Sequence, residues 1–183
     1  QIVNFSATYG NGPMLMNVGA YGLFILMYYN LIGAEFNGVT FGVIFCMLST
    51  CNSGSHPGNI WPITLGYAMA SQIFQRIAPM VGGDYVQYLH AQPIIVGLCY
   101  ANGLSPIADK YGWHYGILAS AMHYVLVTSV PALHGGYCLY NGGFTAALIC
   151  LILVPQLERF SNTKEERKLA RTAKSAAKAP VAE

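Results

Sequence analysis

Charged residues are scarce in this sequence and make up only 9% of its 183 residues, whereas an average soluble domain contains about 25%. They are also segregated, because residues 1–157 contain five charges and residues 158–183 contain the other eleven. A soluble domain needs charges over its whole surface to stay dissolved. The sequence therefore predicts a transmembrane domain in residues 1–157, followed by a basic cytoplasmic tail in residues 158–183.

Other features are absent as well. The sequence has no initiator Met and no signal peptide, so we expect Gln1 to follow a proteolytic cut or a preceding segment of a longer protein. The five cysteines lack paired Cys-x-x-Cys spacing and the five histidines lack short paired spacing, which predicts no metal site and no cofactor. The basic residues are few and lie beside the membrane domain, so we expect no nucleic acid partner.

Long apolar segments are what the sequence does contain. Four of them, at 15–32, 60–75, 91–108 and 113–131, approach or reach the length of about 17–25 residues that spans a bilayer. Two more, at 39–51 and 144–157, are shorter and favour half-helices or re-entrant segments. Seven basic residues in the tail favour a cytoplasmic C-terminus. If both short segments are re-entrant, Arg76 also lies inside and Lys110 lies outside.

Each short segment follows a polar stretch with Asn-Gly near its centre, at residues 32–42 and 133–145. In this topology the first and fourth spans cross in opposite directions, so the two units are related by inversion. Inverted repeats with broken helices recur in secondary transporters, because irregular backbone at membrane depth must be buried or line a wet cavity. We therefore predict an all-α polytopic membrane protein with re-entrant helices in an inverted repeat, in which Asn37 and Asn141 approach each other.

Adjacent glycine pairs flank the second Asn-Gly stretch, at residues 135–136 and 142–143. Such pairs permit positive φ angles and close backbone approach. Tight helix packing is the alternative, since small residues also gather at helix interfaces. We favour a non-helical backbone, because packing glycines usually repeat at four-residue spacing.

Three segments together resemble an uncharacterised bacterial membrane family known as domain of unknown function 1576. They are Gly33–Gly42 (GAEFNGVTFG), His56–Asn59 (HPGN) and Gly135–Phe144 (GGYCLYNGGF). The resemblance covers nearly all of residues 15–157 and implies a C-terminal portion, since members of the family are about twice this length. Tyr140-Asn141-Gly142 is also similar to an element of urea transporters, which are built from inverted halves. Their Leu-Pro-x-x-x-x-Pro-Phe signature is absent here, which leaves the substrate open.

The first polar stretch supplies three candidate solute-binding residues, Glu35, Asn37 and Thr40. A carboxylate inside a bilayer costs about 2.5–3.5 kcal/mol on insertion scales, so Glu35 is a functional candidate unless it lies at the membrane edge. Asn37 and Asn141 either direct amides into a cavity or cap the helices that follow them. We expect Glu35→Gln to change activity more than stability.

The second polar stretch supplies His134, Tyr140 and Asn141 as further solute-binding candidates. His123 and His134 are about three helical turns apart, so they are candidates for a proton relay. The alternative for each histidine is a structural hydrogen bond to a carbonyl, because neutral imidazole both donates and accepts.

Three functions are compatible with these features. The first is a transporter or channel-like facilitator for a small polar solute, with its site between the two Asn-Gly elements. The second is a non-catalytic membrane subunit of a larger complex. The third is an intramembrane enzyme, but no nucleophile–base pair is recognisable by spacing, so we expect no enzymatic activity. We favour the first function, in a bacterial inner (plasma) membrane, with a homo-oligomer or an N-terminal partner segment completing the protein.

The tail contains basic residues every three or four positions, from Lys164 to Lys178. A helix with this spacing presents one basic face to anionic lipid. A solvated, disordered end is the alternative.

Overall fold

A computed structural model describes residues 4–81, 88–133 and 141–176, and all secondary structure in these residues is helical. This confirms the prediction of an all-α fold. The elements in chain order are α1 (Phe5–Tyr9), α2 (Asn11–Leu31), α3 (Gly38–Ser49), η1 (Thr50–Ser53), α4 (Pro57–Ile77), η2 (Ala78–Val81), α5 (Gln92–Ala101), η3 (Asn102–Leu104), α6 (Ser105–Tyr111), α7 (Trp113–Leu133), α8 (Asn141–Phe160) and α9 (Lys164–Ala176).

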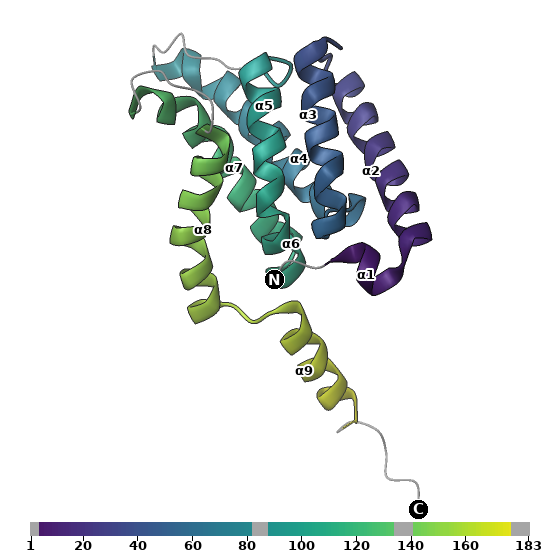
Figure 1. Ribbon diagram of the computed structural model, residues 1–183. Coiled ribbons are helices and arrows are strands. Elements are labelled where there is room, and N and C mark those ends of the chain that lie inside the picture. The colour runs from purple at the N-terminus through teal and green to yellow at the C-terminus, as the bar shows by residue number, and fades with distance from the viewer. Residues whose placement is uncertain (1–3, 82–87, 134–140, 177–183) are drawn as a thin grey trace, which may run out of the picture.

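The long helices lie side by side in a bundle, and α9 projects from one end of it (Figure 1). Helices α5, η3 and α6 follow one another from residue 92 to residue 111 and together run the length of the bundle. The four segments expected to be full spans are therefore all helical. The 3-10 turn η3 begins at Asn102, within the interruption that the sequence indicated near Asn102-Gly103.

Sequence signals at the helix ends explain where the chain turns. Asn37 caps α3, because its side-chain oxygen accepts hydrogen bonds from Val39 N at 3.0 Å and Thr40 N at 3.1 Å. His56 caps α4 in the same way, accepting from Gly58 N at 3.1 Å. Gly112 ends α6 with a φ angle of +122°, a conformation that favours glycine, so the chain reverses there into α7.

Helices α2, α4 and α7 run in one direction. Trp61 stacks near Trp113 with ring centroids 6.0 Å apart, and six residues further along α4 Tyr67 meets His123 of α7. Paired contacts that advance together along both helices mean that α4 and α7 are parallel. Contacts between α2 and the segment from Ser55 to Thr64 advance in the same sense, so α2 is parallel to both.

Helices α3, α5 and α8 run in the other direction. The Cys99 thiol lies 3.8 Å from the Val43 carbonyl, and Asn102 donates to Thr50 at 2.6 Å, so α3 and α5 are parallel. At its start α8 packs on Tyr100, and near its end Glu158 pairs with Lys110 at 3.2 Å. Helix α8 is therefore parallel to α5–α6 and also to α3.

The inverted-repeat prediction is wrong for these residues. Helices α2 and α7 are parallel, and the two helices that follow the Asn-Gly stretches, α3 and α8, are also parallel. Both α3 and α8 extend along the bundle beside α5 (Figure 1), so neither enters and leaves at the same end as a re-entrant segment would. The segment predicted at 144–157 is a 20-residue helix, because its first turn includes the glycines that were expected to break it.

The expected distribution of charge changes with this topology. Lys110 pairs with Glu158 and therefore lies at the same end of the bundle as α9. Arg76 lies in the last turn of α4, at the opposite end. The prediction that Arg76 shares a side with the tail and Lys110 does not is therefore wrong. Among the described residues, every Lys and Arg except Arg76 lies in α6, in α9 or in the last turn of α8.

Much of the outside of the bundle is apolar. Helical stretches Asn11–Leu31 and Asn141–Lys174 are long and apolar enough to cross a membrane, judged by length and composition. In each stretch, only 28% of the most apolar 18-residue segment is buried, whereas the core helix of a soluble protein is mostly buried. Large side chains such as Leu23 and Leu151 are more than 70% exposed. The apolar residues of these helices therefore face outward.

Candidate functional site

The first predicted group of site residues forms the cap of α3. Glu35 is exposed, and its backbone carbonyl accepts from the Thr40 hydroxyl at 2.5 Å. The Asn37 side chain is used by the two N–H groups of the helix end, so the capping role is confirmed. Thr40 is buried beneath this cap. The part that these residues play in solute binding stays a prediction.

The second predicted group is only partly described, because His134 and Tyr140 lie outside the described residues. Asn141 is buried at the start of α8, and its Nδ2 donates to the Val127 carbonyl of α7 at 3.1 Å. That carbonyl would normally accept from the N–H of residue 131, four positions further along the helix. Residue 131 is proline, which has no N–H. Asn141 therefore supplies the donor that Pro131 lacks.

His123 lies in the interior of the bundle and is fully buried. Its Nε2 is 2.9 Å from the Gly142 carbonyl, which can only accept, so Nε2 carries the proton. Its Nδ1 is 2.5 Å from the Tyr67 hydroxyl, which then donates. Both ring nitrogens of a neutral His123 are thus satisfied, as in the structural alternative. A relay between His123 and His134 stays a prediction, since residue 134 is not described.

Glycine 142 is a packing residue within α8. A Cβ placed on it would lie 2.7 Å from the Tyr100 side chain, closer than real side chains pack. The non-helical backbone predicted for Gly142 and Gly143 is wrong, because both belong to the first turn of α8. The alternative of tight helix packing is confirmed for Gly142.

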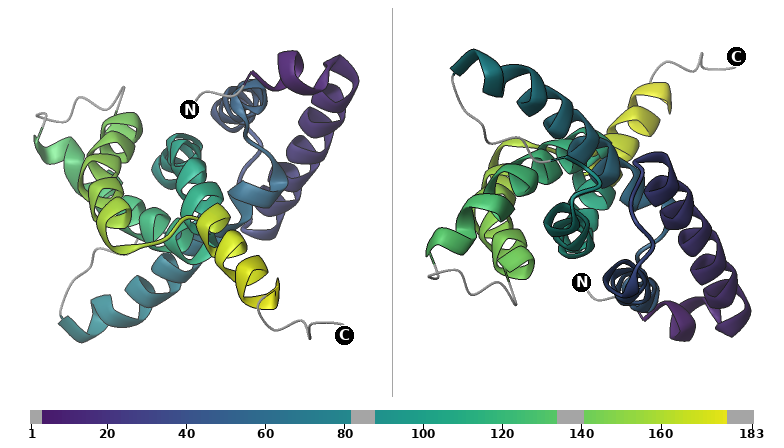
Figure 2. Two further views of the ribbon diagram at one scale, coloured as in Figure 1. Left: turned by 90° about the horizontal axis from the view of Figure 1, so that it is seen from below. Right: turned by 90° about the horizontal axis from the view of Figure 1, so that it is seen from above.

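Helix α5 separates the two Asn-Gly helices. Cys99 contacts Val43 of α3, while Tyr100 contacts Gly142 of α8, and the end-on views place α5 between α3 and α8 (Figure 2). Helix α5 therefore lies between the two Asn-Gly helices, and a solute site between Asn37 and Asn141 stays a prediction.

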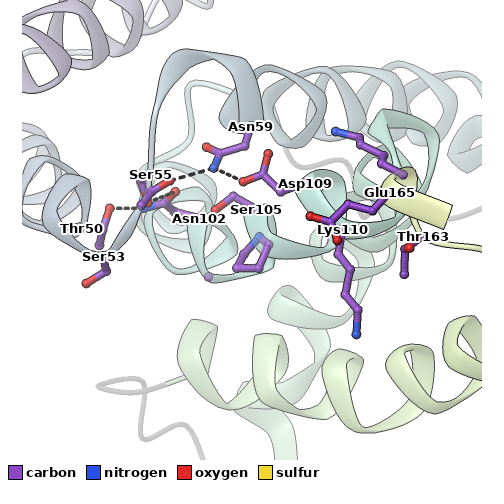
Figure 3. Close-up of a pocket in the computed structure, with 14 residues that line it drawn as sticks. Thr50, Ser53, Ser55, Asn59, Asn102, Ser105, Asp109, Lys110, Thr163 and Glu165 are labelled. Carbon is purple, nitrogen blue, oxygen red and sulfur yellow. Dashed lines mark hydrogen bonds between the residues drawn. The ribbon is translucent and has the colours of Figure 1, made fainter. Parts of the chain in front are cut away.

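A polar cavity lies at the opposite end of the bundle from these two caps, beside the start of α9 (Figure 3). Its volume is about 660 Å³. The walls come from η1, the turn before α4, η3, α6 and the segment that enters α9. The lining residues are Thr50, Ser53, Gly54, Ser55, Asn59, Asn102, Gly103, Ser105, Pro106, Asp109, Lys110, Thr163, Lys164 and Glu165.

Asn59 organises one wall of this cavity. The side chain is buried, and its Nδ2 donates to Asp109 Oδ2 at 2.6 Å and to the Gly54 carbonyl at 2.9 Å. Its Oδ1 accepts from His56 N at 3.0 Å. The amide thus ties the start of α4 to α6 and fixes the position of the Asp109 carboxylate. The Asp109 side chain is 45% exposed, so it remains accessible from the cavity.

Asn102 organises the adjoining part of the lining. Its Nδ2 donates to Thr50 Oγ1 at 2.6 Å, and its Oδ1 lies 3.3 Å from the Ser55 hydroxyl. The Ser55 carbonyl in turn accepts from Asn17 of α2 at 2.8 Å. These contacts join three helices and fix the polar groups in this part of the lining, as Figure 3 shows for Thr50, Ser55 and Asn102.

The rim of the cavity carries charges of both signs. Lys110 pairs with the exposed Glu158 at 3.2 Å. Lys164 and Glu165, at the start of α9, also line the cavity. His56 Nε2 lies 3.8 Å from Asp109 Oδ2. The described residues contain no group of three or more His, Cys, Asp or Glu that could hold a metal ion. The cavity therefore offers hydrogen bonds and the accessible carboxylates of Asp109 and Glu165 to a small polar molecule.

Sequence reasoning missed Asn59, Asn102 and Asp109. Each was assigned to a turn or to an interruption, where polar residues are common. One signal was available: Asp109 is one of only five charges in residues 1–157, and the rule that selected Glu35 also applies to it.

Comparison with known proteins agrees with the resemblance in the sequence. No curated protein and no solved structure matches the chain. A family profile described as protein of unknown function (DUF1576) matches residues 1–159, which include α1 to α8 except the last residue of α8. The chain therefore belongs to the DUF1576 family.

Proposed function

We propose that this protein is an integral membrane transporter or channel-like facilitator, and that the polar cavity beside α9 binds its small polar solute. The observation that carries the proposal is the cavity itself. Hydrogen-bonding groups from segments far apart in the sequence line about 660 Å³ at the end of a bundle with an apolar exterior.

The exterior of the bundle supports membrane insertion. Leu15, Met16, Leu23, Met27 and Leu31 of α2 are 63–82% exposed, while Ser71, His123 and Thr145 are fully buried. Apolar residues outside and hydrogen-bonded polar residues inside suit a bilayer, in which polar groups must find partners within the protein.

The distribution of basic residues supports an orientation with the cavity on the cytoplasmic side. Basic residues concentrate at the α9 end, and Arg76 stands at the other end. Cytoplasmic segments carry the excess of Lys and Arg. Trp113 lines a groove together with residues of α9, and its ring pairs with that of Trp61; aromatic residues typically mark the membrane interface.

The cavity lining favours a neutral or cationic solute. Asp109 lies next to the buried Asn59, which holds one of its oxygens, whereas the other charged lining residues, Lys110, Lys164 and Glu165, stand at the rim. A cationic or hydrogen-bond-donating group gains from a carboxylate in a partly enclosed site, whereas an anion is repelled. The amides and hydroxyls around it suit a solute with several donors and acceptors.

Membrane integration is tested by washing membranes that contain the full chain with alkaline carbonate. We expect the protein to stay in the pellet and to require detergent for extraction. Release into the supernatant would contradict the membrane assignment.

Transport is tested by measuring fluxes of a panel of radiolabelled small polar solutes into proteoliposomes. We expect saturable flux of at least one neutral or cationic solute, reduced at least tenfold by Asp109→Asn. Glu166→Gln is the matched control, because Glu166 lies at the same end of the bundle but does not line the cavity. Glu35→Gln tests the site that the sequence predicted.

The variants separate the two sites. Loss of flux in Asp109→Asn with normal flux in both other variants supports the cavity. Loss in Glu35→Gln alone would move the site to the start of α3. Absence of flux for every solute with the folded, unmodified protein would contradict transport.

A further inference from the structure

A second, basic groove lies beside the polar cavity, between α9 and the start of α7. Its volume is about 290 Å³, and it is lined by Gly112, Trp113, His114, Lys164, Arg167, Lys168 and Arg171. Residues 164, 167, 168 and 171 are spaced three and four apart, so they share one face of α9. The helix predicted in the tail is thus present, with its basic face turned toward the bundle.

Arg167 attaches α9 to the bundle. Its guanidinium donates to the Tyr111 carbonyl, in the last turn of α6. A cation is favoured there, because the carbonyls at a helix C-terminus carry partial negative charge. The contact sets the groove at the α6–α7 corner and leaves Lys164, Lys168 and Arg171 exposed.

The acidic residues of α9 do not neutralise this groove. Glu166 lies on the far side of the helix from Lys164, and Glu165 lies at the edge of the basic face, outside the groove lining. Glu166 accepts from Thr163 N at 2.8 Å and thereby caps the start of α9. No Asp or Glu lines the groove, so its four cations have no acidic partner within it.

We propose that this groove binds the phosphate of an anionic phospholipid headgroup in the bilayer around the bundle, an inference that rests on the membrane insertion proposed above. Three observations identify the occupant. The groove is cationic, it opens at the end where the apolar exterior of α8 gives way to charge, and Trp113 on its wall is 54% exposed. An interfacial Trp packs at the level of lipid headgroups, while Arg and Lys bind phosphate oxygens.

Native mass spectrometry of the detergent-purified full chain tests the site. The probes are phosphatidylglycerol, phosphatidylcholine and soluble glycerol phosphate. We expect bound phosphatidylglycerol in preference to phosphatidylcholine, and no retained glycerol phosphate. Each basic residue near an anionic surface contributes about a fivefold effect on binding, so Lys168→Gln with Arg171→Gln should weaken phosphatidylglycerol binding about 30-fold.

The matched control is Arg159→Gln with Lys174→Gln, which removes the same charge outside the groove. We expect this control to weaken binding less than fivefold. Equal losses in both double variants would show diffuse attraction to a basic tail and overturn the site. Equal retention of glycerol phosphate and phosphatidylglycerol would overturn the lipid as the occupant.

This experiment is independent of transport. A protein that transports solute but binds all lipids equally contradicts the groove alone. A protein that binds phosphatidylglycerol in the groove but shows no flux contradicts the transporter alone.

Discussion

Replacing Gly66 by alanine tests the packing of α4 against α7. A Cβ at Gly66 would lie 1.9 Å from Ser120 Oγ and 2.6 Å from the Ile117 carbonyl oxygen, whereas ordinary contact begins at 3.4 Å. The Ser120 side chain can rotate away, but the Ile117 carbonyl belongs to the backbone of α7. The two helices must therefore move apart locally by about 0.8 Å, and every neighbouring contact between them weakens.

The expected loss of stability follows from two opposing effects. Overpacking costs about 3 kcal/mol when backbone must move, and replacing a helical glycine by alanine contributes about 1 kcal/mol in favour of folding. The net loss of about 2 kcal/mol corresponds to a Tm lower by about 4–8 °C in a chain of this size. Circular dichroism of the full chain in one fixed detergent and lipid mixture measures it.

Two further variants make this test decisive. Gly42→Ala is the control, because Gly42 is helical and exposed and a Cβ there meets nothing within 4 Å, so we expect an unchanged or higher Tm. Adding Ser120→Gly to Gly66→Ala should recover little, since the Ile117 carbonyl remains in place. A Tm for Gly66→Ala equal to that of Gly42→Ala, or full recovery with Ser120→Gly, would refute the close approach of the two backbones.

Two other predictions concern buried donors and helix caps. Asn141→Ala leaves the Val127 carbonyl without a donor and should cost about 1–3 kcal/mol of stability. Adding Pro131→Ala restores a backbone N–H at residue 131 and should recover most of this loss. If thermal unfolding shows that the two substitutions destabilise additively, the pairing of Asn141 with the Val127 carbonyl is contradicted. Asn37→Ala removes the cap of α3 and should cost about 1 kcal/mol, or about 2–4 °C in Tm. Asn37→Asp keeps the accepting oxygen at a helix N-terminus and should unfold like the original protein; if it is equally destabilised, capping is not the role of Asn37.

The helical fold was predictable because its signals are local. Apolar runs and the Asn37 cap each depend on neighbouring residues. The length of α8 was underestimated because Asn141, Gly142 and Gly143 are poor helix formers. They are tolerated in a first turn, where the N–H groups have no partner within the helix. Because its length was underestimated, α8 was predicted to be re-entrant, and the prediction of an inverted repeat depended on that assignment.

The polar cavity was less predictable because its contacts are not local. Asn59 and Asp109 are 50 residues apart, and Asn102 and Thr50 are 52 apart. Each reads as an ordinary turn or interruption residue in the sequence. The parallel course of α3 and α5 brings Thr50 and Asn102 together, and the packing of the start of α4 on α6 brings Asn59 and Asp109 together. The resemblance to a family of unknown function could not locate the cavity, since it assigns no activity to any residue.

The concentration of basic residues at the α9 end also bears on how the chain enters a bilayer. At the other end, the described residues of the connections, 32–37, 78–81 and 88–91, contain Glu35 but no Lys or Arg, and Arg76 in the last turn of α4 is the described basic residue nearest to them. Such segments carry little charge across the hydrocarbon layer when α2–α3, α4–α5 and α7–α8 insert as helical hairpins. The chain around α9 would have to move many cations. If the chain inserts into a membrane as proposed above, this asymmetry biases its biogenesis toward one orientation before any tertiary contact forms.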